Sequence, residues 1–147
     1  MKLVTLKAVI ALALLLAALA LPLLGCAADD VIEIGEQFFV AQILEIYMAA
    51  DSYQGQTIRY QGMFWSLDRD QDQFSHYVTR ETESCCGPGG IIGFEVLLDD
   101  LDIEPFANYA WVEVTGVLLE PQPGWLRLQV IEIVELEERG AEFVRHN

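Results

Sequence analysis

The sequence predicts a mainly β fold: a five-stranded barrel preceded by one amphipathic helix, behind a cleaved lipoprotein signal peptide. Three observations lead to this prediction. A basic and then apolar N-terminal segment ends in a cysteine, one later stretch has helical periodicity, and five stretches after it have the composition of strands. The residues that follow position 25 are enough for one domain with its own core.

The first 25 residues have the organisation of a bacterial secretory signal. Lys2 and Lys7 precede an apolar run over 8–24, and the run ends in Leu-Leu-Gly-Cys, a lipobox. In such a signal the cysteine thiol receives a diacylglycerol, and cleavage makes that cysteine the mature N-terminus. We therefore expect Cys26 to be lipidated and to hold the chain to a membrane of the bacterial cell envelope, on its extracytoplasmic side. A plain cleaved signal and an uncleaved anchor are the alternatives, since a bilayer span needs roughly 20 apolar residues.

The segment after the signal is expected to form a tether and then a helix. Residues 26–36 are small and acidic, with one short strand at 31–34. Over 37–50, apolar side chains such as Phe39 and Ile43 recur at steps of three and four residues, and no glycine or proline interrupts the pattern. This spacing predicts an amphipathic helix.

The remaining chain favours strands separated by turns. Five stretches are rich in aromatic and β-branched residues: 57–65, 74–82, 91–98, 110–119 and 125–136. With a short helical insert at 99–106, their order matches an OB-type barrel, in which Gly62 and Gly116 would permit the bends that closure needs. Helix and barrel would form one domain over 37–137, followed by a polar tail at 138–147. An open β-sandwich, or a meander with the helix on one face, is the alternative.

Charge excludes one class of function. After the signal the chain has no lysine and six arginines against 23 acidic residues, a formal charge of −17. Such a surface repels polyanions, so we exclude nucleic acid as a partner. The acidity either attracts cations or serves solubility in a salt-adapted proteome.

The chemistry is expected around two adjacent cysteines. Cys85 and Cys86 lie in a glycine-rich loop between two predicted strands, and they are the only cysteines besides Cys26. His76 lies nine residues before the pair and Glu95 nine residues after it. If the two strands are neighbours, this placing would bring the imidazole and the carboxylate across from each other, below the thiols. Such a ligand set suits zinc, or Cu(I) through the thiolates alone.

Other interpretations of the cysteine pair stay open. Neighbouring Cα atoms are about 3.8 Å apart, below the usual disulfide range, so a vicinal disulfide would be strained, although an oxidising compartment favours it. A redox-active pair would normally have two residues between the cysteines. No nucleophilic triad can be assembled from the serines, and we therefore do not expect an enzyme.

Several landmarks together resemble a known pattern. They are Gly55–Ile58, Gly62, Arg80 before Cys85-Cys86, Gly93–Glu95 and Trp111–Gly116. Over about residues 53–118 the chain is similar to the extracytoplasmic domain of an uncharacterised family of predicted bacterial permease subunits and of related small lipoproteins. The resemblance implies an OB-like domain in which Cys85 and Cys86 are the site and Arg80 flanks it. It also implies a membrane permease as partner.

Together these features predict a membrane-tethered binding module rather than a catalyst. We expect an accessory lipoprotein for a transporter, with zinc held by Cys85 and Cys86 and by Glu95 or His76. The alternative is a structural or interaction lipoprotein in which Cys85 and Cys86 form a vicinal disulfide and no metal binds.

Overall fold

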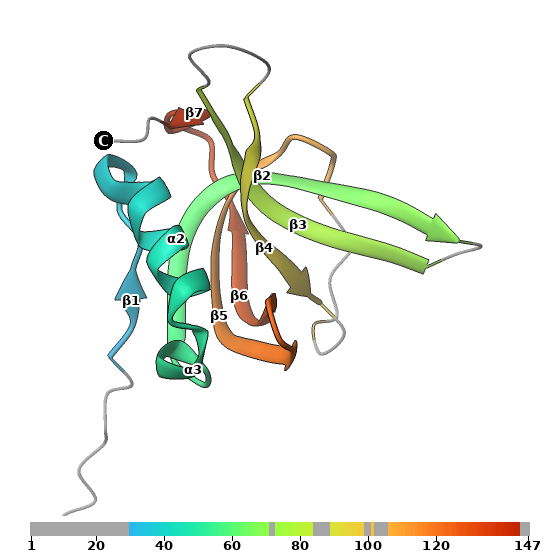
Figure 1. Ribbon diagram of the computed structural model, residues 1–147. Helices are drawn as coiled ribbons and strands as arrows, with labels where there is room; N and C mark the ends of the chain where they lie inside the picture. The colour runs from blue at the N-terminus through green and yellow to red at the C-terminus, as the bar shows by residue number, and fades with distance from the viewer. Residues whose placement is uncertain (1–29, 71–72, 84–88, 99–100, 102–105, 145–147) are drawn as a thin grey trace, which may run out of the picture.

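The computed structural model describes residues 30–70, 73–83, 89–98, 101 and 106–144, and within them the fold is mainly β (Figure 1). A short N-terminal helical region packs against the strands. The elements in chain order are β1 (Ile32–Glu33), η1 (Glu36–Phe38), α2 (Phe39–Met48), α3 (Ala50–Tyr53), β2 (Thr57–Asp70), β3 (Gln73–Thr82), β4 (Ile91–Leu97), β5 (Trp111–Gln122), β6 (Trp125–Glu135) and β7 (Phe143–Val144).

The five long strands pair in a closed circuit. The strand order is β1-β2-β5-β6-β4-β3-β7, and an additional pairing joins β2 to β3. Within the circuit every pairing is antiparallel except that of β4 with β6, which is parallel. The short strands β1 and β7 add in parallel to β2 and β3. Figure 1 shows how the circuit closes: β2 curves across the molecule, and it pairs with both β5 and β3.

Glycines mark the places where strands approach most closely. The first half of β2 pairs with β5 and the second half with β3, and Met63 pairs with both. At the preceding Gly62 a Cβ atom would lie 2.8 Å from the carbonyl oxygen of Thr79. At Gly116 a Cβ would lie 2.7 Å from a carbonyl oxygen of β6, beside a register shift in the β5–β6 pairing. Both positions therefore require glycine for space.

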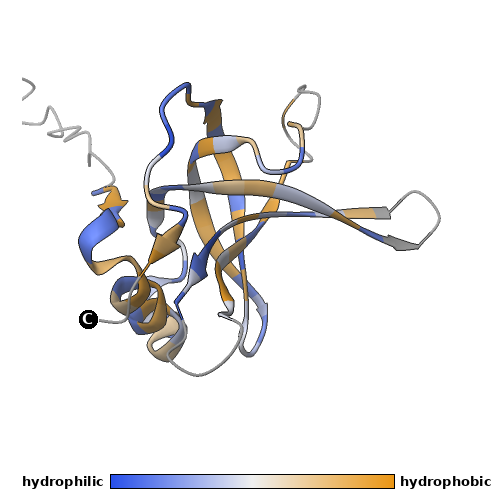
Figure 2. Cartoon of the chain, turned by 90° about the horizontal axis from the view of Figure 1, so that it is seen from above, coloured by the Kyte–Doolittle hydropathy of each residue, from blue (hydrophilic) through white to orange (hydrophobic). Residues whose placement is uncertain are grey.

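The core lies inside the circuit and under the helix. Alternate residues of the strands point inward, and α2 contributes an apolar stripe at helical spacing. Figure 2 shows hydrophobic positions, in orange, along both the strands and the helix. The largest fully buried side chains are Trp111, Tyr60, Phe39, Phe64 and Phe94. The Tyr60 hydroxyl donates to the carbonyl oxygen of Val78 at 2.7 Å and accepts from the Phe94 N–H at 3.3 Å, which links three strands. Burial raises the pKa of Tyr60 above its usual value.

The first two long strands extend further than the sequence pattern predicts. The strand expected over 57–65 continues to Asp70, and its partner begins at Gln73, so β2 and β3 form an arm that projects from the body (Figure 1). Leu67 and Phe74 on this arm are exposed. The backbones of the two strands stay paired along the arm, but no core lies beneath them to bury their side chains. Such a strand has no alternation of apolar and polar residues, so hydrophobic periodicity does not predict it.

Both ends of the described chain join the sheet. Part of the expected tether forms β1, and Ile34 is buried beside it. Part of the expected polar tail forms β7, where Val144 is buried and Phe143 pairs with Glu81. The short strand expected at 31–34 is confirmed as β1. The two-residue strand β7 is too short for periodicity to reveal, which is why the sequence predicts only a polar tail there. The sheet thus includes a short strand beyond the domain boundary expected at residue 137.

Candidate functional site

The predicted cysteines lie outside the described residues, but the base of their loop lies within them. Thr82 at the end of β3 donates its N–H to the Gly90 carbonyl at 2.7 Å. The Thr82 hydroxyl donates to the same carbonyl at 3.0 Å and accepts from the Gly90 N–H at 2.9 Å. A Cβ atom at Gly89 would overlap the Thr82 carbonyl oxygen. The connection that contains Cys85 and Cys86 therefore begins and ends at a tightly bonded neck.

Two hollows flank this neck. One, of about 430 Å³, lies between α2 and the start of β4 and is mainly apolar; its lining includes Leu44, Tyr47 and Ile91. The Tyr47 hydroxyl donates to the Gly93 carbonyl at 3.0 Å, and burial raises the pKa of this phenol. The other hollow, of about 410 Å³, is lined by Glu81, Thr82, Glu83, Gly89 and Phe143. Both are lined by Thr82 and Glu83, so ligand-sized space and carboxylates adjoin the neck.

His76 lies in β3 and packs on the core. It is opposite Val96 in β4 and Ser66 in β2, and its Nδ1 lies 2.8 Å from the Ser66 hydroxyl oxygen. Its ring stacks on Phe64 with centroids 5.6 Å apart. Six residues separate His76 from Thr82, which is about 20 Å along a strand. The imidazole is thus far from the neck.

Glu95 is a buried carboxylate with its own partners. It is 6% exposed, and its Oε2 accepts from the Trp125 indole N–H at 2.8 Å and from Arg127 Nε at 2.9 Å. The Arg127 guanidinium lies over the Trp125 ring, 3.6 Å from its centroid. The three side chains form a compensated cluster on β4 and β6, which is the usual condition for a carboxylate to be buried.

The structure does not bring His76 and Glu95 together. The strands β3 and β4 are neighbours, as predicted, but Glu95 is opposite Tyr77 rather than His76. Since consecutive residues of a strand point to opposite faces, the imidazole and the carboxylate lie on opposite sides of the sheet. The imidazole and the carboxylate are therefore not across from each other, as symmetric pairing of the strands about Cys85 and Cys86 would have placed them. Within the described segments, no group of three or more His, Cys, Asp or Glu side chains could hold a metal ion.

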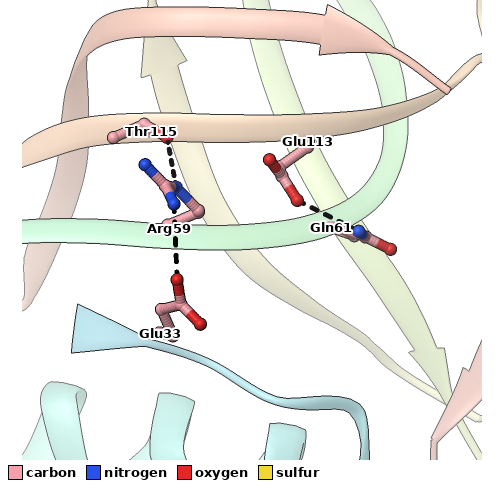
Figure 3. Close-up of polar contacts among 5 residues, drawn as sticks. All are labelled: Glu33, Arg59, Gln61, Glu113 and Thr115. Atoms are coloured by element: carbon pink, nitrogen blue, oxygen red, sulfur yellow. Dashed lines mark hydrogen bonds and ion pairs between the residues drawn. The ribbon is translucent and has the colours of Figure 1, made fainter. Parts of the chain in front are cut away.

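Sequence reasoning missed a polar cluster on the outer face of β2 and β5 (Figure 3). Arg59 Nε donates to the Thr115 hydroxyl at 3.1 Å, and its Nη1 lies 3.3 Å from Glu33 Oε1 on β1. One pair of residues further along, Gln61 Nε2 donates to Glu113 Oε2 at 3.0 Å. The alternation of side chains along β2 and β5 puts both pairs on one face of the sheet. The register that sets the partners opposite each other depends on the tertiary fold and cannot be read from the sequence.

Arg80 borders the same cluster from β3. It is 2% exposed, and its guanidinium lies 4.6 Å from the ring centroid of Phe39 and 5.0 Å from that of Trp111. Its Nε donates to the Gln61 carbonyl at 2.8 Å, and its Nη1 lies 3.7 Å from Glu36 Oε1. Burial lowers the pKa of Arg80, and the charge of Glu36 opposes this shift. Arg80 therefore faces the polar cluster and η1, whereas the family resemblance implies that it flanks the cysteine pair.

These groups surround a polar pocket of about 260 Å³. Its lining residues are Glu33, Ile34, Gly35, Glu36, Arg59, Tyr60, Gln61, Arg80 and Glu113. Three carboxylates and two guanidinium groups thus face one small space. The pocket is the most highly charged hollow described in this structure, and we call it the outer-face pocket.

The described residues form a small, mainly β domain with several hollows on its surface. The chain belongs to the DUF1980 C-terminal domain family, a bacterial family without an established function, which matches residues 23–139. This match includes residues 53–118, the span that carries the landmarks of the sequence resemblance. No curated protein and no solved structure matches the chain. No helix of the described residues is long and apolar enough to cross a membrane.

Proposed function

We propose that this chain is an extracytoplasmic lipoprotein that binds a transition metal, with zinc as the expected ion, and serves as an accessory module of a transporter. The lipobox ending at Cys26 supports the proposed location, anchored to a membrane outside the cytoplasm. The single observation that favours metal binding is the bonded neck between Thr82 and Gly90, which holds the base of the Cys85-Cys86 connection between two hollows.

We propose further that the domain is an OB-like barrel. The circuit of β2, β3, β4, β6 and β5, with its parallel pairing of the third and fifth long strands, supports this assignment. Domains of this type bind ligands on the strand faces and in the loops at the barrel rim. The cysteine connection links the second and third long strands, and in such a barrel it would lie at the rim.

The ligand set that we propose differs from the one that the sequence suggests. Cys85 and Cys86 would supply thiolates, and Glu81 or Glu83 would supply a carboxylate in place of Glu95 or His76. The two glutamates line the hollow at the neck. Two thiolates with one carboxylate leave an open position on a tetrahedral zinc ion, and an open position suits a protein that passes its metal to a partner.

Elemental analysis of the mature lipoprotein, purified in detergent without chelator, tests the proposal. We expect near-stoichiometric zinc or copper in the native chain and none in a Cys85→Ser/Cys86→Ser variant. Glu83→Gln should weaken binding, whereas His76→Gln should retain the metal and so serves as the matched control. An intact mass lower than the reduced value by two hydrogens, with no metal present, would instead establish the vicinal disulfide and a purely structural role.

A separate experiment tests whether Cys26 is lipidated and anchors the chain to a membrane. Cells that express the native chain and are fed labelled palmitate should incorporate it into the protein, and a Cys26→Ser variant should not. Membrane fractions should retain the native chain and lose the variant. Equal labelling of both chains would refute lipidation at Cys26 without touching the metal proposal.

A further inference from the structure

The outer-face pocket presents charges of both signs in a volume suited to a metabolite. Its polar lining comes from three segments: the β1–η1 connection, the outer face of β2 and β5, and the end of β3. A volume of about 260 Å³ equals that of about nine waters at roughly 30 Å³ each. A molecule of about ten non-hydrogen atoms would fill it.

The cationic end of the pocket is Arg80. Its Nε and Nη1 have protein partners, but Nη2 donates to no group of the described residues. Its ion-pair partner Glu36 is 3.7 Å away and mostly exposed, so the buried guanidinium is only partly compensated. A buried charge of this kind is stabilised by any further acceptor that reaches it. Arg59, which lines the same space, likewise has no described partner at Nη2.

The anionic end is Glu113. Its Oε2 accepts from the neutral Gln61 amide, and no guanidinium of the described residues pairs with it. Gln61 lies between the two ends, since its carbonyl accepts from Arg80 while its side chain donates to Glu113. Gln61 therefore contacts both a guanidinium and a carboxylate of the pocket lining.

The balance of charge narrows the class of ligand. Three carboxylates against two guanidinium groups give the lining a net charge of −1, which disfavours phosphates and other dianions. The described residues hold no group of acids, cysteines and histidines suited to a metal ion. A simple cation would leave Arg80 Nη2 without an acceptor, and a simple anion would leave Glu113 without a cation.

From this arrangement we propose that the outer-face pocket binds a small zwitterion of the α-amino acid class. The ligand carboxylate accepts from Arg80 and Arg59, and the ligand ammonium donates to Glu113. This pocket shares no lining residue with the two hollows at the neck, and the proposal is independent of metal binding.

Calorimetric titration of the mature lipoprotein in detergent tests the proposal, with glycine, L-serine, L-leucine and L-arginine as probes. Acetate and ethylamine each present one half of the ligand. We expect at least one amino acid to bind, and each half-ligand to bind about tenfold more weakly or worse. Arg59→Gln and Glu113→Gln should each weaken binding about tenfold or more, since each removes one charge-assisted contact. Both side chains are outside the core, so these variants should fold.

Two controls separate this inference from other effects. Glu138→Gln, an exposed carboxylate outside the pocket, should leave amino-acid binding unchanged. Cys85→Ser/Cys86→Ser should also leave it unchanged, even where that variant loses its metal. The proposal is overturned if no amino acid binds up to about 10 mM. It is also overturned if both pocket variants bind as the native chain does, or if either half-ligand binds as tightly as the amino acid.

Discussion

Glu95 shows how a buried charge can be structural rather than a ligand. Its carboxylate accepts from Trp125 and Arg127, so replacing it leaves two donors without an acceptor. We expect Glu95→Ala to lower the free energy of unfolding by about 3 kcal/mol, measured by urea denaturation. The loss in a Glu95→Ala/Arg127→Ala variant should be smaller than the sum of the single losses. Glu95→Gln should retain any bound metal. A loss of metal with unchanged stability would show that Glu95 is a ligand after all.

The placement of His76 and Glu95 shows why the site could be predicted only in part. A connection symmetric about the bond between Cys85 and Cys86 would pair His76 with Glu95. The neck instead pairs Thr82 with Gly90, which displaces the register by one residue and puts His76 opposite Val96. A shift of one residue moves a side chain to the other face of a sheet. The sequence supplies the candidate residues, but the turn geometry decides which of them meet.

The buried Tyr60 makes the free energy of unfolding depend on pH in the alkaline range. Its hydroxyl is buried and hydrogen-bonded to Val78 and Phe94, and burial raises its pKa above the usual value of 10.0. Because the folded pKa lies above the unfolded one, this contribution is complete below about pH 10 and is lost as the pH rises above it. We expect Tyr60→Phe to cost about 1 kcal/mol at neutral pH and to make the alkaline fall shallower. Urea titrations between pH 8 and about 11 measure both effects.

The control for Tyr60 is another tyrosine. Tyr109 is exposed, so Tyr109→Phe should leave both the neutral stability and the alkaline slope as in the native chain. Equal slopes for the native chain and Tyr60→Phe would mean that other groups govern the alkaline transition.

At the scale of the elements, the helix and the long strands are predictable because their periodicity is strong. The helix expected over 37–50 corresponds to α2 and α3, and each of the five expected strands has an observed counterpart. The division of β2 between two partners is not predictable, since it depends on the curvature of the whole circuit. The same holds for β7, whose two residues gain their order from the neighbouring strand β3. The short strand expected at 31–34 corresponds to β1.

Gly62 is the residue on which the division of β2 depends. A Cβ there would lie 2.8 Å from the Thr79 carbonyl oxygen, which is backbone and cannot move aside without breaking the β2–β3 pairing. We expect Gly62→Ala to lower the free energy of unfolding by about 2 kcal/mol, measured by urea denaturation. Gly35→Ala is the matched control, because its Cβ would meet nothing within 4 Å. Similar losses of stability in both variants would show that the substitution acts on the unfolded chain and not through a clash in the folded state.

At the scale of the whole molecule, the excess of acidic residues is the dominant property. The chain after the signal carries six arginines against 23 acidic residues. Among the described ion pairs, Arg127 with Glu95 is mostly buried on both sides, whereas in Arg80 with Glu36 only the arginine is buried. Unpaired carboxylates at the surface repel one another and destabilise the compact state. Salt screens this repulsion, since the Debye length falls from about 30 Å at 0.01 M to about 3 Å at 1 M.

Stability should therefore rise with ionic strength. We expect the Tm of the mature lipoprotein to increase by several degrees between about 0.01 M and 0.5 M sodium chloride, measured by circular dichroism at neutral pH. Potassium chloride should act equally, because screening depends on charge and not on the identity of the ion, whereas a specific site would distinguish the two cations. A Tm that stays constant would mean that the acidic surface is already neutralised by bound cations. A Tm that falls would mean that ion pairs such as Arg127–Glu95 outweigh the repulsion. The acidic surface would then serve a purpose other than adaptation to high salt.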